Sequence, residues 1–218
     1  GTLGDGTVLS VSKWYDQSGN GNDLLSEAVS SEPRLDIVAP TISNPGEFED
    51  ALSGVKFNGT TSYLRFLRPE TVNVKNQPVS SFNVVRLQTQ GSLNRQIYGT
   101  NTNRGLAALQ NRAKYYFTTR SIQPFVNSQR FPTATQVLFS AIHDGTTTAP
   151  NVRMSYNGGT ISTVSVHQGS ANVSTHIHTV GRRKDYATSS NYFFGHMREL
   201  ILYTSDKTSQ RSAIESNI

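Results

Sequence analysis

One polar loop holds the side chains of this sequence that are best suited to bind a metal ion. Residues Trp14 to Asp23 read W-Y-D-Q-S-G-N-G-N-D, and Asp16, Asn20 and Asp23 supply oxygen atoms beside two glycines. A Ca²⁺ ion takes roughly six to eight oxygen ligands from such a loop, although the bidentate glutamate of an EF-hand is missing. The same residue types also form turns in which Asp and Asn side chains accept backbone N–H groups. The sequence therefore predicts either a calcium site at Asp16, Asn20 and Asp23 or a structural turn.

The sequence offers few carboxylate pairs of the kind that hydrolyse glycosidic bonds. Such a pair flanks the scissile bond, and on a strand its members would stand two residues apart, because alternate residues share a face. Glu47 and Glu49 have this spacing, but Pro40 and Pro45 interrupt the surrounding stretch. Glu199 has no acidic residue two positions away on either side. A binding role is therefore favoured over catalysis, and a glycoside hydrolase or polysaccharide lyase is the alternative.

A second group of candidate metal ligands is formed by histidines. His176 and His178 alternate along a strand-like segment, and His167 is a possible third ligand. Such imidazoles on one face can start a zinc site. The sequence has no cysteine, and no carboxylate stands close by, so surface histidines are the simpler interpretation. Motifs of a serine-hydrolase nucleophile or of a phosphate-binding glycine loop are absent from the sequence.

Residues suited to sugar recognition recur near the ends of expected strands and in turns. An aromatic ring stacks on the apolar face of a sugar, and planar polar groups bind its hydroxyls. Core packing explains part of these aromatics without any ligand. The candidates for a glycan-binding site are Tyr115, Arg153, Tyr156, Asn157, Asn191 and Tyr192.

Composition and charge limit the class of partner. The 218-residue chain has a net charge of +5 and a pI of about 9.6, and its arginines favour anionic glycans, since Arg pairs bidentately with carboxylate and sulfate. The basic residues are dispersed and form no recognised nucleic-acid module, so nucleic acid is not expected. No apolar run approaches the ~18 residues of a membrane span, so membrane insertion is not expected. An oligomer is compatible with the sequence.

Short alternating segments joined by turns make up most of the chain. Strands are expected near residues 7–15, 54–57, 63–66, 81–87, 95–99, 106–109, 114–118, 137–143, 152–156, 161–166, 176–181, 192–195 and 196–203, with a short edge strand at 35–38. Asn58-Gly59 and Asn157-Gly158 mark turns between strands. A helix is expected over residues 205–215, capped by Ser205 or Thr208, with Ala213 and Ile214 facing inward. The pattern predicts an all-β fold, a single antiparallel β-sandwich with a short C-terminal helix.

Several of these stretches together resemble a known family. They are W-Y-D-Q-S-G-N-G-N-D, G-V-K-F-N-G-T-T-S-Y-L, S-F-N-V-V-R, A-I-H-D-G with V-R-M-S-Y-N-G-G, and F-F-G-H-M-R-E-L-I-L-Y-T with A-I-E. In this order they resemble the concanavalin A-like, laminin-G-like lectin and glucanase sandwich domains of bacterial and phage surface proteins. The opening motif also looks like the start of α-arabinofuranosidase catalytic domains, but no stretch matches the acidic catalytic residues of that group.

The resemblance implies a jelly-roll sandwich over residues 1–218, one domain excised from a larger protein, with the helix on an edge. It implies a non-catalytic module that binds a glycan or cell-surface polysaccharide, and a location outside the cell or on a cell or virion surface, as in phage tails or adhesion proteins. Because this fold also hosts spacers, a structural or interaction domain without a glycan ligand is the second hypothesis.

Overall fold

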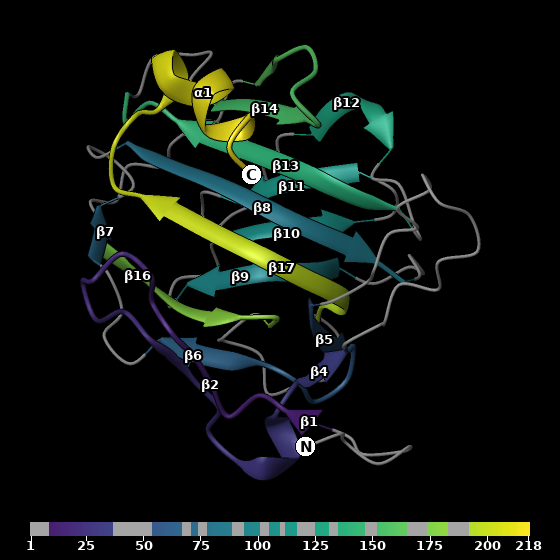
Figure 1. Ribbon diagram of the computed structural model, residues 1–218. Coiled ribbons are helices and arrows are strands. Elements are labelled where there is room, and N and C mark those ends of the chain that lie inside the picture. The colour runs from purple at the N-terminus through teal and green to yellow at the C-terminus, as the bar shows by residue number, and fades with distance from the viewer. Residues whose placement is uncertain are drawn as a thin grey trace, which may run out of the picture.

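The computed structural model describes most of the strands of the chain. It covers residues 9–36, 54–66, 71–73, 78–88, 94–100, 105–109, 112–116, 125–130, 135–146, 152–164, 174–182 and 192–218. Within these ranges the chain forms two antiparallel sheets and one short α-helix (Figure 1). The predicted all-β antiparallel sandwich with a C-terminal helix is thereby confirmed.

Sheet A forms one layer, with β17 and β8 at its centre. Its strand order is β1-β4-β5-β17-β8-β13-β14-β15, and each neighbouring pair is antiparallel. The bounds are β1 (Leu9–Ser10), β4 (Arg34–Asp36), β5 (Gly54–Asn58), β17 (Phe194–Tyr203), β8 (Val79–Leu87), β13 (Gln136–His143), β14 (Val152–Tyr156) and β15 (Ser162–Val164).

Sheet B forms the other layer. Its order is β12-β11-β10-β9-β16-β6-β3-β2, with β7 paired to β16 off this path. The bounds are β12 (Phe125–Arg130), β11 (Arg112–Tyr116), β10 (Gly105–Leu109), β9 (Asn94–Thr100), β16 (Ser174–Val180), β6 (Leu64–Phe66), β3 (Leu24–Leu25), β2 (Lys13–Trp14) and β7 (Thr71–Asn73). A 3₁₀ helix, η1 (Val29–Ser31), follows β3.

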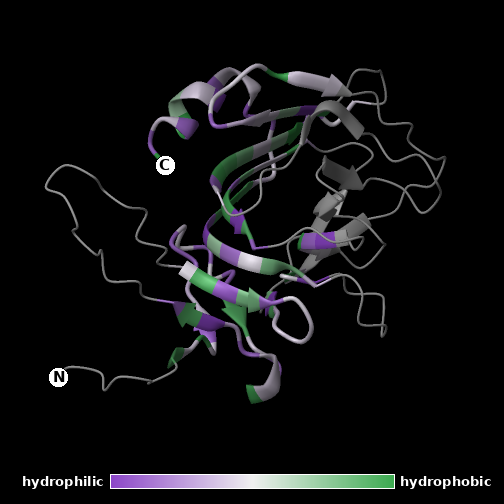
Figure 2. Ribbon diagram, turned by 90° about the vertical axis from the view of Figure 1, so that its right-hand side faces the viewer, coloured by the Kyte–Doolittle hydropathy of each residue, from purple (hydrophilic) through white to green (hydrophobic). Residues whose placement is uncertain are grey.

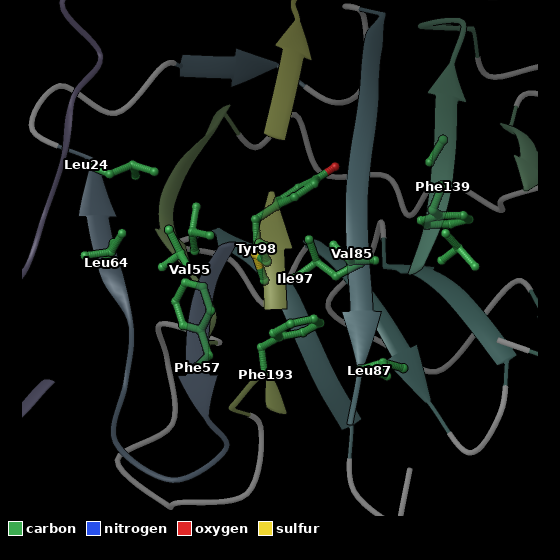
Figure 3. Close-up of a cluster of buried hydrophobic side chains, with 14 of the residues drawn as sticks. Leu24, Val55, Phe57, Leu64, Val85, Leu87, Ile97, Tyr98, Phe139 and Phe193 are labelled. Carbon is green, nitrogen blue, oxygen red and sulfur yellow. The ribbon is translucent and has the colours of Figure 1, made fainter. Parts of the chain in front are cut away.

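The core lies between the two sheets, because alternate residues of each strand point inward. Phe57 from β5 and Leu64 from β6 are completely buried, as is Ile97 from β9. The ring of Phe57 meets that of Phe193 edge-on, with centroids 5.9 Å apart (Figure 3). Trp14 is partly buried and packs against this cluster, so the aromatic start of the polar loop is anchored in the sandwich.

A β-bulge interrupts β17. The register against β8 shifts between Met197 and Glu199, which leaves Arg198 as the extra residue. A bulge of one residue reverses the alternation of the faces. Met197 before the bulge and Leu200 after it therefore both pack against the core, while Arg198 and Glu199 are exposed.

Part of the outer face of sheet A is covered by the C-terminal segment (Figures 1 and 2). Phe82 on β8 meets Tyr203 edge-on at 6.1 Å. The Ser80 hydroxyl donates to the Ser205 carbonyl at 2.8 Å and accepts the Lys207 N–H at 3.0 Å. Strand β8 is consequently buried on both faces, apart from Arg86, which is half-buried.

The C-terminal helix is shorter than the sequence predicts. A 3₁₀ turn, η2 (Thr208–Gln210), precedes α1 (Arg211–Glu215), and the Asp206 carboxylate accepts the Thr208 N–H at 2.7 Å. The expected caps were Ser205 or Thr208, and Ala213, expected to face inward, is exposed. The helix lies over the face of sheet A (Figure 1). In the described part of the chain, no helix is long and apolar enough to cross a membrane.

Candidate functional site

The Asp16 carboxylate organises the polar loop after β2. Its Oδ1 accepts the Ser18 N–H at 2.8 Å, and its Oδ2 accepts the Ser18 hydroxyl at 2.8 Å and the Asn22 N–H at 2.9 Å. These bonds lower the pKa of Asp16, the Ser18 hydroxyl most of all. The Asp23 carboxylate accepts the Asp16 N–H at 2.9 Å and pairs with the Lys13 ammonium at 2.7 Å. The loop is thus an ordered turn held by its own side chains.

Calcium binding by Asp16, Asn20 and Asp23 stays a prediction. In the described residues, no cluster of three or more His, Cys, Asp or Glu side chains forms a metal site, so loop amides and carbonyls would supply the remaining oxygens. If calcium binds, EDTA will lower the melting temperature and added calcium will restore it, because a ligand that prefers the folded state stabilises it. A melting temperature unaffected by EDTA contradicts the calcium site.

Three of the predicted sugar-binding residues lie around the β13–β14 pair but point in different directions. The Arg153 guanidinium pairs with the Asp144 carboxylate at 3.1 Å. The Tyr156 ring stacks on Phe139, with centroids 5.0 Å apart, and packs against the core. Asn157 has a φ of 47°, and its side-chain oxygen accepts the Leu138 N–H at 2.8 Å. Each of these residues thus has a partner within the fold, and their part in glycan binding stays a prediction.

The structure describes only some of the other predicted site residues. Tyr192 precedes β17 and is half-buried. Tyr115 lies in β11, and His176 and His178 lie in β16, but their side chains are outside the described residues. Outside the described residues altogether lie Asn191, Glu47, Glu49 and His167.

The outer surface of sheet B brings together side chains from neighbouring strands. Lys13, Leu25, Arg65 and Thr179 are in direct register across β2, β3, β6 and β16. Directly paired residues share a face, and the adjacent row, which includes Trp14, faces the core. Lys13 and its neighbours therefore lie on the outer side of the sheet.

Tyrosines flank this row on the outer side. The Tyr15 ring is 63 % exposed, and the Lys13 ammonium lies 4.4 Å from its centroid. At the other end, the Tyr63 ring lies 3.8 Å from the guanidinium carbon of Arg182 and 6.4 Å from the Tyr192 ring. We call this surface the tyrosine face and define it by Lys13, Tyr15, Glu27, Tyr63, Arg65, Arg182 and Tyr192.

Glu27 links the charged groups of the tyrosine face. Its carboxylate accepts the Tyr63 hydroxyl and pairs with the Arg65 guanidinium at 2.7 Å. The Tyr63 hydrogen bond is the main cause that lowers the pKa of Glu27. Burial first, and then the bond to Glu27, raise the pKa of Tyr63. Tyr63, which is 8 % exposed, therefore stays a neutral donor to the charged Glu27 carboxylate, an arrangement poor for a tyrosine nucleophile.

Five of the described carboxylates are stabilised in their charged form. Hydrogen bonds and ion pairs lower the pKa of several of them, and at Asp36 and Asp144 they outweigh burial, which acts in the opposite direction. A glycosidase general acid needs a raised pKa, and the pKa of each of these five carboxyl groups is shifted in the opposite direction. The carboxylates with a lowered pKa are Asp16, Asp23, Glu27, Asp36 and Asp144.

Sequence reasoning found only Tyr192 of the tyrosine face. The other members come from four separate segments, and only the register of β2, β3, β6 and β16 brings them together. One signal was available: Tyr63 and Arg65 alternate with Leu64 and Phe66, which places the two polar residues opposite the apolar pair.

The chain is similar to known proteins in structure but matches none of those compared in sequence. No protein-family model matches the chain, and no curated protein matches its sequence. A Trypanosoma rangeli sialidase in complex with sialic acid aligns with a TM-score of 0.61 and 12 % identity over 96 % of this chain and 32 % of the sialidase. Another structure of Trypanosoma rangeli sialidase gives 0.59 and 11 % over 94 % and 31 %.

A further similar structure is domain 4 of AbnA, a GH43 extracellular arabinanase from Geobacillus stearothermophilus, in complex with arabinotriose. It has 14 % identity over 95 % of this chain and 98 % of that domain, but its TM-score of 0.47 is too low to support an argument. The chain spans about a third of the sialidase it matches. At these identities the likeness to the sialidase establishes the β-sandwich fold alone.

Proposed function

We propose that this protein is a non-catalytic module that binds carbohydrate on its tyrosine face. The observation that carries the proposal is the exposed Tyr15 ring, which stands on a loop already fixed by the Asp16 and Asp23 hydrogen bonds. An exposed aromatic ring stacks on the apolar face of a sugar, and a site that is ordered beforehand loses little entropy on binding.

The rest of the tyrosine face supplies polar recognition. Glu27 and Arg65 form an ion pair that is about half exposed, so both groups remain available to sugar hydroxyls. The Arg182 guanidinium lies over Tyr63, and a guanidinium in this position binds a carboxylate or sulfate of an anionic glycan. The lowered carboxyl pKa values described above favour binding over hydrolysis.

We further propose a concanavalin A-like, laminin-G-like sandwich that acts as one domain of a larger protein on a cell or virion surface or outside the cell. The β-sandwich shared with a sialidase supports the architecture. A hydrolase or lyase would place two acids on one groove, and a structural domain would bind no glycan.

The proposed function is tested on an array of neutral and acidic glycans, followed by titration of the best ligand. Tyr15→Ala is expected to weaken binding about tenfold, because a lost aromatic contact costs on the order of 1 kcal/mol. Tyr15→Phe keeps the ring and is expected to bind like the wild type. Val29→Ala, at another exposed apolar residue, is the control.

Two results would contradict this proposal. Unchanged affinity of Tyr15→Ala would remove the tyrosine face as the site. Absence of binding to every glycan on the array would leave the structural or protein-interaction role.

A further inference from the structure

The outer face of sheet A carries a line of polar side chains that crosses five strands. Arg34 on β4 pairs in register with Lys56 on β5, Lys56 with His196 on β17, His196 with Arg86 on β8, and Arg86 with Gln136 on β13. Directly paired residues project on the same side. Because Val55 and Phe57 on either side of Lys56 are buried in the core, this side faces away from the second sheet.

One carboxylate neutralises the centre of this line. Asp36 Oδ2 lies 2.8 Å from the Lys56 ammonium and 2.9 Å from His196 Nε2. Arg34 is exposed and Arg86 half-buried, and within the described residues neither guanidinium has a hydrogen-bond or ion-pair partner. Two unpaired cations therefore flank a neutralised centre.

Arg198 adds a third cation to the same face. It is the extra residue of the β17 bulge and is exposed. Its guanidinium reaches the Gln136 side-chain oxygen only at 3.5 Å, and its Cγ lies above Gly54, 3.3 Å from the position of an added Cβ. Arg198 stands two residues after His196 and so projects on the same side of the sheet as the line. It adds charge at the end of the line that holds Arg86 and Gln136.

We propose that this line is a second binding site, for an acidic polysaccharide that carries carboxylate or sulfate groups. We call it the basic row and define it by Arg34, Lys56, His196, Arg86 and Arg198. Adjacent strands lie about 4.8 Å apart, so Arg34 and Arg86, three strands apart, stand about 14 Å from each other. They suit two acidic groups of one extended chain, each held bidentately by a guanidinium.

The chemistry of the basic row favours a polysaccharide over other polyanions. Single-stranded nucleic acid is held by aromatic side chains on which bases stack, and the row contains none. A protein partner would need a buried apolar or aromatic anchor, whereas the row consists of arginine, lysine and histidine side chains. A polysaccharide with regularly spaced acidic groups needs only the cations and their spacing.

This inference goes beyond the proposed function, because it concerns the opposite sheet and rests on different residues. It does not require that the tyrosine face bind sugar. The two surfaces are distinguished by the variants that affect each: Tyr15→Ala for the tyrosine face, and Arg34→Ala or Arg86→Ala for the basic row.

The test is titration calorimetry of the full chain with polygalacturonate, which carries carboxylates, and dextran sulfate, which carries sulfates, with uncharged dextran for comparison. Wild-type protein is expected to bind at least one polyanion, with an affinity that falls as salt is added. Arg34→Ala combined with Arg86→Ala is expected to weaken that binding at least tenfold. Comparing polygalacturonate with dextran sulfate shows whether the basic row prefers carboxylate or sulfate groups.

Lys207→Ala is the matched control for charge, because it removes one positive charge beside Tyr203, away from the row. It is expected to bind the polyanion like the wild type. Melting temperatures of all variants confirm that they are folded. The proposal is overturned if wild type binds neither polyanion, if the double variant binds unchanged, or if Lys207→Ala loses as much affinity as Arg34→Ala alone.

Discussion

Gly181→Ala is expected to lower the free energy of unfolding by roughly 2–5 kcal/mol. Gly181 has a φ of +83°, and an added Cβ would lie 2.4 Å from two ring carbons of Phe57. That ring is completely buried and meets Phe193, so it has no space into which to move. Hydrogen bonds of 2.8 Å from the Gly181 N–H to the Ile97 carbonyl, and from the Phe193 N–H to the Gly181 carbonyl, hold the backbone in place.

Gly19→Ala is the matched control for this substitution. Gly19 has nearly the same backbone angle, a φ of +80°, but an added Cβ there has no atom within 4 Å. Gly19→Ala is therefore expected to lower the free energy of unfolding only by the cost of the left-handed backbone, about 1–2 kcal/mol. Urea unfolding of both variants measures the difference. Equal losses would mean that Phe57 yields and that the core around it is looser than described.

Glu215→Ala is expected to lower the free energy of unfolding by about 3–5 kcal/mol, because it leaves a largely buried charge without its partner. The Glu215 side chain is 4 % exposed and that of Arg211 13 %, and the two pair at 2.9 Å. The Glu215 carboxylate also accepts the hydroxyls of Ser140 and, at 3.0 Å, Ser155. Arg211 donates to the Ser155 hydroxyl at 2.9 Å and to the Gly159 carbonyl at 3.3 Å.

Two further variants test whether stability depends on the two charged side chains themselves or only on neither charge being left unpaired. Replacing both residues, Arg211→Met with Glu215→Leu, is expected to recover much of the loss, since apolar side chains leave no unpaired charge. Glu199→Ala, at an exposed carboxylate of β17, is expected to change stability by less than about 0.5 kcal/mol. If Glu215→Ala lowers the free energy of unfolding as little as Glu199→Ala does, the network does not stabilise the position of α1.

The strands could be predicted because their signal is local. Val55 and Phe57 alternate with polar residues, and the Asn58-Gly59 turn forms as expected: the Asn58 side-chain oxygen accepts the N–H groups of Thr60 and Thr61 at 2.9 Å. The predicted helix is longer than the observed one, because the residues before Arg211 form a 3₁₀ turn and the Asp206 carboxylate accepts the Thr208 N–H ahead of it. Side-chain bonds to the backbone compete with helix formation in this way.

The candidate sites were largely beyond sequence reasoning, because register decides which distant residues meet. The arginines appear dispersed along the chain, yet Arg34 and Arg86 fall in one row through β5 and β17. Tyr156 and Asn157 have residue types suited to sugar binding, but one packs against the core and the other closes a turn. Residue type indicates what a side chain can do, and the register of the sheets decides which neighbours it has.

The position of β17 has a consequence for how the protein folds during synthesis. Although β17 is late in the chain, it lies between β5 and β8 in sheet A. Until residues 194–203 have left the ribosome, β5 and β8 are therefore open edges, which can pair with other chains. Contacts between segments so far apart also form slowly, because a long loop must close first. Sheet A can be completed only after β17 emerges, and until then the open β8 edge of the nascent chain is exposed to aggregation.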